Sequence, residues 1–200
     1  VVMAPACDTA TSRWVESSFG RGTGNRAVTP ELLEALNAVV REANVDPARI
    51  YLTGQSMGGV GTWGLLAKHG DRFAAAVPVC GIWPPEDAPK MNGVAIWAFH
   101  GDMDQRVPVR GSRDMIAALK KAGVNPEPHY TELPGVGHGS WGPAYETTEM
   151  WDWLFSQRRS LAQEMIDFRP VDGFLKLPPD MKLGPCSGVD IDSRGNIYVI

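Results

Sequence analysis

The sequence has few cysteines and no long hydrophobic run. Its three cysteines, Cys7, Cys80 and Cys186, are too few and too widely spaced for a disulfide framework. No Cys-x-x-Cys pair and no Cys/His spacing typical of a metal site occurs, so we expect no bound metal. No apolar run approaches the roughly 18 residues that a membrane span requires, so no membrane partner is expected. The first ten residues lack the features of a signal peptide, and the sequence assigns no cellular location.

An excess of positive charge is also lacking. The sequence has 19 Lys and Arg residues and 23 Asp and Glu residues, which gives a net charge of −4. It contains no basic stripe. Nucleic acid is therefore not an expected partner. A hydrophobic content of 44% over 200 residues is instead typical of a globular chain with a sizeable core. The composition favours a small, neutral partner and does not indicate an oligomeric state.

Apolar periodicity predicts strands that alternate with helices through about residue 157. Thr29 is the expected N-cap of the first helix, with Pro30 at its first position, and Gly70 is the expected left-handed residue that ends the second. The expected strands cover residues 49–53, 73–80, 94–99 and 128–133, and the expected helices cover 30–43, 57–69, 109–122 and 145–157. This alternation predicts an α/β fold with a mostly parallel sheet and helices on both faces.

The composition changes after residue 157. Residues 158–186 are dense in Pro and Gly and read as a linker. In residues 187–200, apolar and polar residues alternate on either side of Ser193–Asn196, which predicts a β-hairpin. A lone hairpin is marginally stable in water, so this end requires more sheet than residues 187–200 supply.

Residues 54–58 have the pattern Gly-x-Ser-x-Gly at the junction of an expected strand and an expected helix. In this context the pattern is typical of a sharp turn that lifts the Ser56 hydroxyl above the sheet. Gly54 and Gly58 would leave room for neighbouring backbone, and Gly59 would allow close packing. Ser56 is therefore the candidate nucleophile. The Met57 N–H, at the start of the helix, is a candidate oxyanion donor.

An acid and a histidine follow in loops at the ends of later strands. Asp104 comes after the strand at 94–99, and His138 lies in a glycine-flanked loop after the last strand. The chain order Ser, Asp, His is that of α/β-hydrolases. Asp102 is a rival acid, and an ordinary loop histidine is the alternative reading of His138.

The other histidines and several tryptophans have simpler readings. His69 suits the helix dipole, His129 is a strand residue, and His100 is a strand-end residue that supports the acid loop; none is assigned catalysis. Three tryptophans in loops near the expected catalytic end are candidate pocket residues, with packing anchors as the alternative: Trp14, Trp83 and Trp141.

These motifs resemble a known family. The run RIYLTGQSMGGVGTWGLLAKHGDRFAAAVPVCG, followed by VAIWAFHGDMDQRVPV and YTELPGVGHGSW, resembles the prolyl-oligopeptidase-like and feruloyl-esterase-like group of α/β-hydrolase serine esterases. That group is related to polyhydroxyalkanoate depolymerases and dienelactone hydrolases, and the resemblance covers residues 49–157. It implies Ser56 as nucleophile, Asp104 as the acid of an HGxxD pattern and His138 as the histidine of a GxGH pattern. Similarly, GPCSGVDIDSRGNIYVI resembles the opening of an NHL-type β-propeller repeat.

The resemblance also implies that residues 1–157 are a partial hydrolase domain lacking its first strands. One such strand would lie between residues 1–5, VVMAP, and the nucleophile strand, and its loop would carry the second oxyanion N–H. Either a gap opens there or VVMAP fills it, since exposed strand edges seek partners. Losing one oxyanion donor costs about 10²–10³ in rate, so we expect the 200-residue chain to be impaired.

The activity implied is hydrolysis of carboxylic esters through an acyl-enzyme, without a cofactor. Acylated plant polysaccharides or small aryl esters are the substrates it suggests. A serine peptidase would use the same three residues. A non-catalytic protein that binds through its propeller is the third alternative.

Overall fold

The computed structural model describes residues 1–6, 12–16, 26–160, 189–191 and 197–199. The chain divides into two compact units, Val1–Ala162 and Gln163–Ile200. Each unit is described by itself.

The first unit contains a parallel sheet of four strands in the order β3-β4-β5-β6. The strands are β3 (Tyr51–Gln55), β4 (Ala75–Val79), β5 (Ala95–Gly101) and β6 (His129–Leu133). This confirms the predicted parallel sheet. The first of these strands begins two residues later than predicted, because Pro47–Arg49 form a 3-10 turn in which the Asp46 carboxylate accepts from the Ala48 N–H at 2.9 Å.

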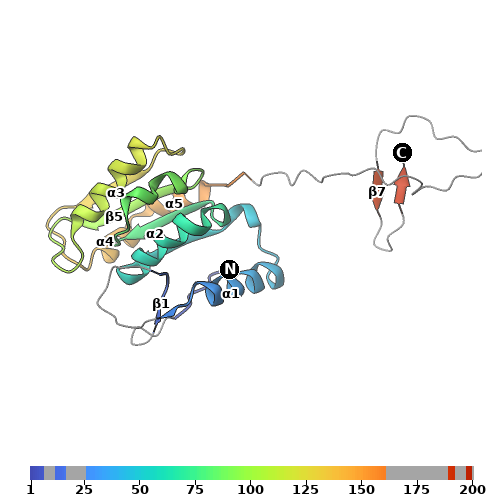
Figure 1. The fold of residues 1–200 in the computed structure, drawn as a ribbon, viewed down its shortest axis with the longest axis horizontal. Helices are drawn as coiled ribbons and strands as arrows, with labels where there is room; N and C mark the ends of the chain where they lie inside the picture. Colours follow the sequence, from blue (N-terminus) through green and yellow to red (C-terminus); the bar gives the residue numbers. More distant parts are fainter. Residues whose placement is uncertain (7–11, 17–25, 161–188, 192–196, 200) are drawn as a thin grey trace, which may run out of the picture. The chain divides into compact units, whose positions relative to one another are not determined.

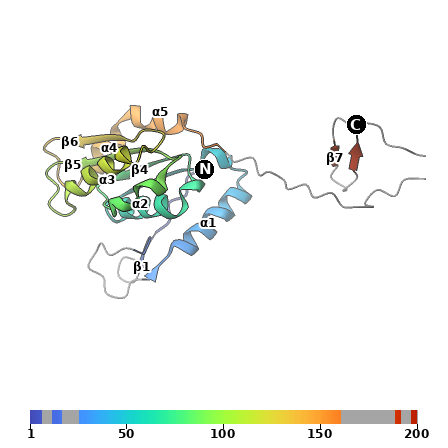
Figure 2. The ribbon, with the colours of Figure 1, turned by 45° about the horizontal axis from the view of Figure 1, so that its top comes forward.

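Helices cover both faces of the sheet, as predicted. On one face lie α2 (Met57–His69) and α3 (Val109–Lys121), and on the other lie α4 (Trp141–Glu146) and α5 (Thr148–Ser156) (Figures 1 and 2). Ala76 and Ile96 pack in the cluster that contains α2 and α3. Their chain neighbours Ala75 and Ala95 pack with α4 and α5. Successive strand residues thus face opposite layers, which explains the uninterrupted apolar runs.

The last predicted helix is two helices. Thr147 has an extended conformation (φ −72°, ψ 101°) and separates α4 from α5. The Trp151 indole N–H donates to the Tyr145 carbonyl at 2.8 Å, which satisfies a carbonyl at the end of α4. The first of the two helices begins at Trp141, four residues earlier than predicted, and Pro143 falls in its first turn, where proline is tolerated.

Two predicted helix ends are also corrected. Helix α1 spans Thr29–Glu42, and Val28 rather than Thr29 occupies the N-cap position, without a side-chain cap. The Thr29 hydroxyl donates instead to the Trp14 carbonyl at 2.7 Å. Gly70 follows α2 with right-handed helical backbone (φ −56°) and continues into the 3-10 turn η2 (Gly70–Arg72), so it is not a left-handed stop.

The N-terminal residues form no strand beside the sheet. Residues 1–6 have no regular structure, and Val1 and Val2 are about nine-tenths exposed. Within the described residues, β3 is the edge of the sheet, and a largely apolar hollow of about 560 Å³ lies between it, residues 1–5 and α1. Of the two expected outcomes, VVMAP filling the place beside β3 is therefore wrong. A two-residue parallel pair, β1 (Ser12–Arg13) with β2 (Arg26–Ala27), interrupts the predicted loop.

In the second unit, β7 (Val189–Ile191) pairs antiparallel with β8 (Ile197–Val199), with Asp190 opposite Tyr198. The predicted turn at 193–196 lies outside the described residues, as do most of the predicted linker, Cys7 and Cys186. That the pair opens a propeller stays a prediction. None of the described helices has the length and apolar character needed to cross a membrane.

Candidate active site

Ser56 sits on a tight turn between β3 and α2. Its backbone has φ 53° and ψ −115°, and its N–H donates to the Val79 carbonyl of the neighbouring strand at 3.0 Å. A Cβ at Gly54 would lie 2.4 Å from the Gly58 carbonyl oxygen, and one at Gly59 would lie 2.4 Å from the Val79 oxygen. The prediction for Gly58 is wrong, because a Cβ there meets nothing within 4 Å. The turn thus requires glycine at 54 and 59.

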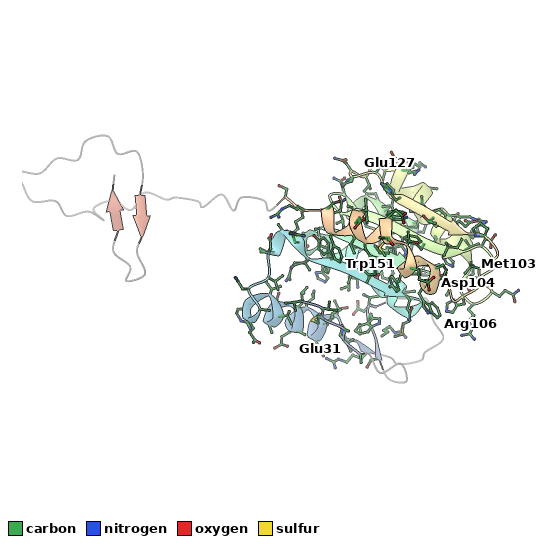
Figure 3. The ribbon with its side chains drawn as sticks, turned by 180° about the vertical axis from the view of Figure 1, so that it is seen from behind. Glu31, Met103, Asp104, Arg106, Glu127 and Trp151 are labelled. Atoms are coloured by element: carbon green, nitrogen blue, oxygen red, sulfur yellow. The ribbon has the colours of Figure 1, made fainter. Side chains whose placement is uncertain are left out.

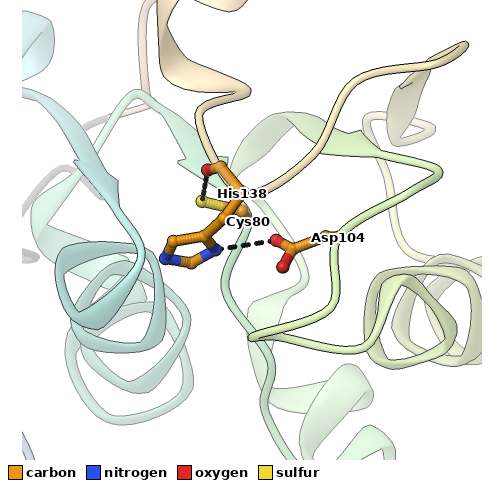
Figure 4. Close-up of side chains that lie close together, drawn as sticks. All are labelled: Cys80, Asp104 and His138. Carbon is orange, nitrogen blue, oxygen red and sulfur yellow. Dashed lines mark hydrogen bonds and ion pairs between the residues drawn. The ribbon is translucent and has the colours of Figure 1, made fainter.

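The fold brings Ser56, His138 and Asp104 into one hydrogen-bonded line. Ser56 Oγ lies 2.9 Å from His138 Nε2, and His138 Nδ1 lies 2.8 Å from Asp104 Oδ2 (Figure 4 shows the His138–Asp104 pair). A carboxylate only accepts hydrogen bonds, so Nδ1 carries the proton and Nε2 accepts from the serine hydroxyl. The Asp104 side chain is fully buried and that of His138 is 15% exposed.

Backbone donors keep Asp104 ionised. Its Oδ1 accepts from the N–H groups of Arg106 at 2.8 Å and Val107 at 2.9 Å. Burial by itself would raise the pKa of Asp104, but the hydrogen bonds from Val107, His138 and Arg106 outweigh it and hold the pKa below its usual value. The rival acid Asp102 accepts from the Gly135 N–H at 2.7 Å, and so links two loops.

The acid loop and the histidine loop are in backbone contact. The Met103 N–H donates to the Val136 carbonyl at 3.0 Å. A Cβ at Gly101 would lie 2.2 Å from the same carbonyl oxygen, so only glycine allows this approach. Met103, Asp104 and Arg106 lie together at one end of the sheet (Figure 3).

A cavity of about 280 Å³ opens beside Ser56 and Met57. Of the three predicted pocket tryptophans, Trp14 lines this cavity, and the Trp141 ring stands edge-on to the His138 ring at 5.6 Å. Trp83 lies elsewhere: it is buried in the core, and its indole N–H donates to Asp87 at 2.8 Å.

Sequence reasoning missed several residues that line the cavity, among them Val60, Ile82, Arg106 and Val107. For Arg106 and Val107 the sequence does offer a signal. Both follow Asp104 closely in the acid loop, and this position could have marked them as cavity residues.

Cys80 lies behind the histidine. Its Sγ is 3.7 Å from the His138 carbonyl oxygen (Figure 4), and its donor atom and those of Asp104 and His138 lie within 4.8 Å of one another. Burial raises the pKa of the Cys80 thiol, which therefore keeps its proton at neutral pH. A protonated thiol that donates to a carbonyl supports the histidine loop and is a poor metal ligand.

The family model for the dienelactone hydrolase family matches residues 7–146. The chain belongs to the dienelactone hydrolase family. The turn at Ser56 and the loop at His138 both lie inside the matched range. A comparison with curated proteins gave no match.

Solved structures with the same fold include several hydrolases. A thermostable esterase is 36% identical (TM-score 0.63), over 66% of this chain and 37% of that chain. Esterase PE8 is 23% identical (TM-score 0.52), over 62% and 59%. The acylaminoacyl peptidase of Pyrococcus horikoshii is 19% identical (TM-score 0.56), over 68% and 28%. The chain thus spans less than two thirds of the length of each. These likenesses and the family support an α/β-hydrolase fold.

Proposed function

We propose that this member of the dienelactone hydrolase family is a serine esterase that hydrolyses carboxylic esters through an acyl-enzyme. The observation that carries the proposal is the line Ser56–His138–Asp104, with contacts of 2.9 and 2.8 Å. A nucleophile bonded to a base, whose other nitrogen is oriented by an ionised carboxylate, is the arrangement that activates a serine hydroxyl.

In this mechanism, His138 Nε2 takes the Ser56 proton as Oγ attacks the ester carbonyl carbon. Asp104 remains ionised and stabilises the imidazolium, and the Met57 N–H donates to the developing oxyanion. His138 then gives its proton to the departing alcohol oxygen as the C–O bond breaks. Water, deprotonated by His138, attacks the acyl-enzyme, and the acid leaves as the Ser56 hydroxyl re-forms. Every step uses groups of the protein and water, so the proposal includes no cofactor.

The cavity beside Ser56 favours a compact acyl group. Val60, Ile82 and Trp14 give it apolar walls, which suit a short acyl chain or an aryl ring. Acylated plant polysaccharides and small aryl esters are the substrate classes we propose.

Oxyanion stabilisation limits the expected rate. The donor we assign is the Met57 N–H, and no second donor is assigned among the described residues. A site with one donor instead of two is expected to turn over about 10²–10³ more slowly. The proposal that the 200-residue chain is impaired rests on this difference.

The test is p-nitrophenyl acetate hydrolysis by the wild-type chain and by Ser56→Ala, with labelling by a fluorophosphonate probe. Ser56→Ala should lose at least about 10³-fold in kcat and all labelling, because the nucleophile is gone. Ser156→Ala is the matched control, since the Ser156 hydroxyl is on α5 and bonds the Trp153 carbonyl.

Equal hydrolysis by wild type and Ser56→Ala would refute the proposal. A p-nitroanilide of the same acyl group, cleaved as fast as the ester, would favour a peptidase instead.

A further inference from the structure

A second histidine contacts Asp104. His100, on β5, is fully buried, and its Nε2 lies 3.3 Å from Asp104 Oδ2 and 3.0 Å from the Val107 carbonyl oxygen. Its Nδ1 lies 2.8 Å from the hydroxyl of Ser112, on α3. The Asp104 carboxylate is therefore held from β5 as well as from the loop of His138.

The partners of His100 fix its proton. The Val107 carbonyl and the Asp104 carboxylate only accept hydrogen bonds, so Nε2 carries the hydrogen. Burial lowers the pKa of His100 despite the opposing effects of Val107 and Asp104, which keeps the ring neutral at pH 7. A neutral imidazole has one N–H, so Nδ1 carries no hydrogen; the Ser112 hydroxyl lies within reach of Nδ1, at 2.8 Å, and of the Gly81 carbonyl oxygen, at 3.2 Å. The tautomer that points an N–H at Asp104 is therefore set by the Val107 carbonyl and the Asp104 carboxylate, and Ser112, itself 1% exposed, contacts the other nitrogen of the ring.

Four N–H groups surround the Asp104 carboxylate. Arg106 and Val107 donate to Oδ1, while His138 Nδ1 and His100 Nε2 share Oδ2. The oxygen that orients the His138 ring is therefore the oxygen that His100 contacts. No backbone donor reaches Oδ2 among the described contacts, so this oxygen is contacted by the two imidazole nitrogens, His138 Nδ1 and His100 Nε2.

We propose that His100 is a positioning residue, which fixes Asp104 Oδ2 through its neutral Nε2–H and so aligns His138 with Ser56. This proposal rests on the proposed esterase function. The competing role is purely structural, in which His100 only ties the acid loop to β5 through the Val107 carbonyl.

The two roles differ in their effect on charge. A carboxylate that loses one donor keeps more negative charge for its remaining partners, so it stabilises the His138 imidazolium more strongly. The acid limb of the kcat/KM profile should then move to higher pH. The titratable groups that face these rings are Asp104 and the protonated Cys80, with Glu132 farther along β6. KM should change little, because His100 does not line the cavity.

The experiment compares His100→Gln with His100→Asn. A glutamine amide nitrogen reaches the place of Nε2, whereas an asparagine amide reaches only the place of Nδ1. His100→Asn should lower kcat by about 10- to 100-fold with KM unchanged, and move the acid limb up by about half a pH unit or more. His100→Gln should restore most of kcat and the wild-type limb. His129→Asn, an exposed histidine on β6, is the control.

A second readout does not need ester turnover. The downfield proton resonance of His138 Nδ1–H, measured by NMR, should shift or broaden in His100→Asn and stay in place in His100→Gln. A wild type that shows this resonance but hydrolyses no ester would refute the esterase and leave the positioning role standing.

Three results would overturn the positioning role. The first is that His100→Asn keeps the wild-type kcat and the wild-type acid limb of the kcat/KM profile. The second is an equal loss in both variants, with an unmoved limb and a lower Tm, and the third is an unchanged resonance in His100→Asn. If His100→Asn does not fold, Ser112→Ala removes the hydroxyl that contacts Nδ1 and holds the ring in place, and the same shifts are expected at smaller size.

Discussion

Two adjacent glycines in the first turn of α2 have different surroundings. A Cβ at Gly59 would lie 2.4 Å from the Val79 carbonyl oxygen and 2.9 Å from the Gly81 nitrogen, both backbone atoms that cannot rotate away. A Cβ at Gly58 would meet nothing within 4 Å. The pattern Gly-x-Ser-x-Gly-Gly therefore combines sterically free space at Gly58 with a packing requirement at Gly59.

Gly59→Ala should destabilise the protein by about 1–3 kcal/mol, because β4 and α2 must separate to admit the methyl group. Gly58→Ala should be neutral or more stable by up to about 1 kcal/mol, since alanine favours the helix. Thermal unfolding of both variants measures the difference. Equal Tm values would show that α2 moves away from β4 without cost.

At the scale of elements, an ion pair links α3 to β6. The Arg113 guanidinium donates twice to Glu132, at 2.8 and 2.5 Å, and the Tyr130 hydroxyl donates to the same carboxylate at 2.9 Å. The hydrogen bonds from Arg113 lower the pKa of Glu132 to about 2, despite a smaller opposing effect of burial. Burial and the bond to Glu132 raise the pKa of Tyr130.

The stabilising effect of this pair should depend on pH. The pKa of Glu132 lies below its usual 4.5 in the folded state. The pair therefore stabilises the fold above about pH 4.5 and loses that effect as the pH falls toward 2. Arg113→Gln should lower the Tm at pH 7, and the difference from wild type should shrink steadily below pH 4.5. Arg110→Gln removes a more exposed pair on the same helix and should have the smaller effect. A Tm difference that does not change with pH would contradict this.

At the scale of the whole molecule, every residue of the proposed mechanism belongs to the first unit. Ser56, Met57, Asp104 and His138 all precede Ala162, where that unit ends. A chain of residues 1–162 should therefore retain the Tm of the main transition and the ester kinetics of the 200-residue chain. Differential scanning calorimetry and p-nitrophenyl acetate turnover on both chains check this. A loss of activity on removing Gln163–Ile200 would assign that unit a part in the reaction.

The sequence predicts the order of the elements and misses features that depend on tertiary contacts. Strands β4 and β5 follow from apolar runs, and Ser56, Asp104 and His138 are proposed from motifs at strand ends. The break at Thr147 has no Gly or Pro of its own; there the Trp151 indole and the Thr147 hydroxyl donate to carbonyls of α4, those of Tyr145 and Pro143. The contact of His100 with Asp104 joins two residues of one HGxxD pattern, but its geometry depends on Ser112 of α3. Periodicity does not show such a contact.

The backbone of Ser56 has a consequence for how this sequence can change. A non-glycine residue at φ 53° and ψ −115° carries strain of about 1–3 kcal/mol, a sizeable part of the 5–15 kcal/mol that typically holds a domain folded. Glycine would relieve that strain and remove the hydroxyl. Selection for stability alone would therefore favour the loss of Ser56, whereas selection for the proposed esterase activity would retain a serine at this turn.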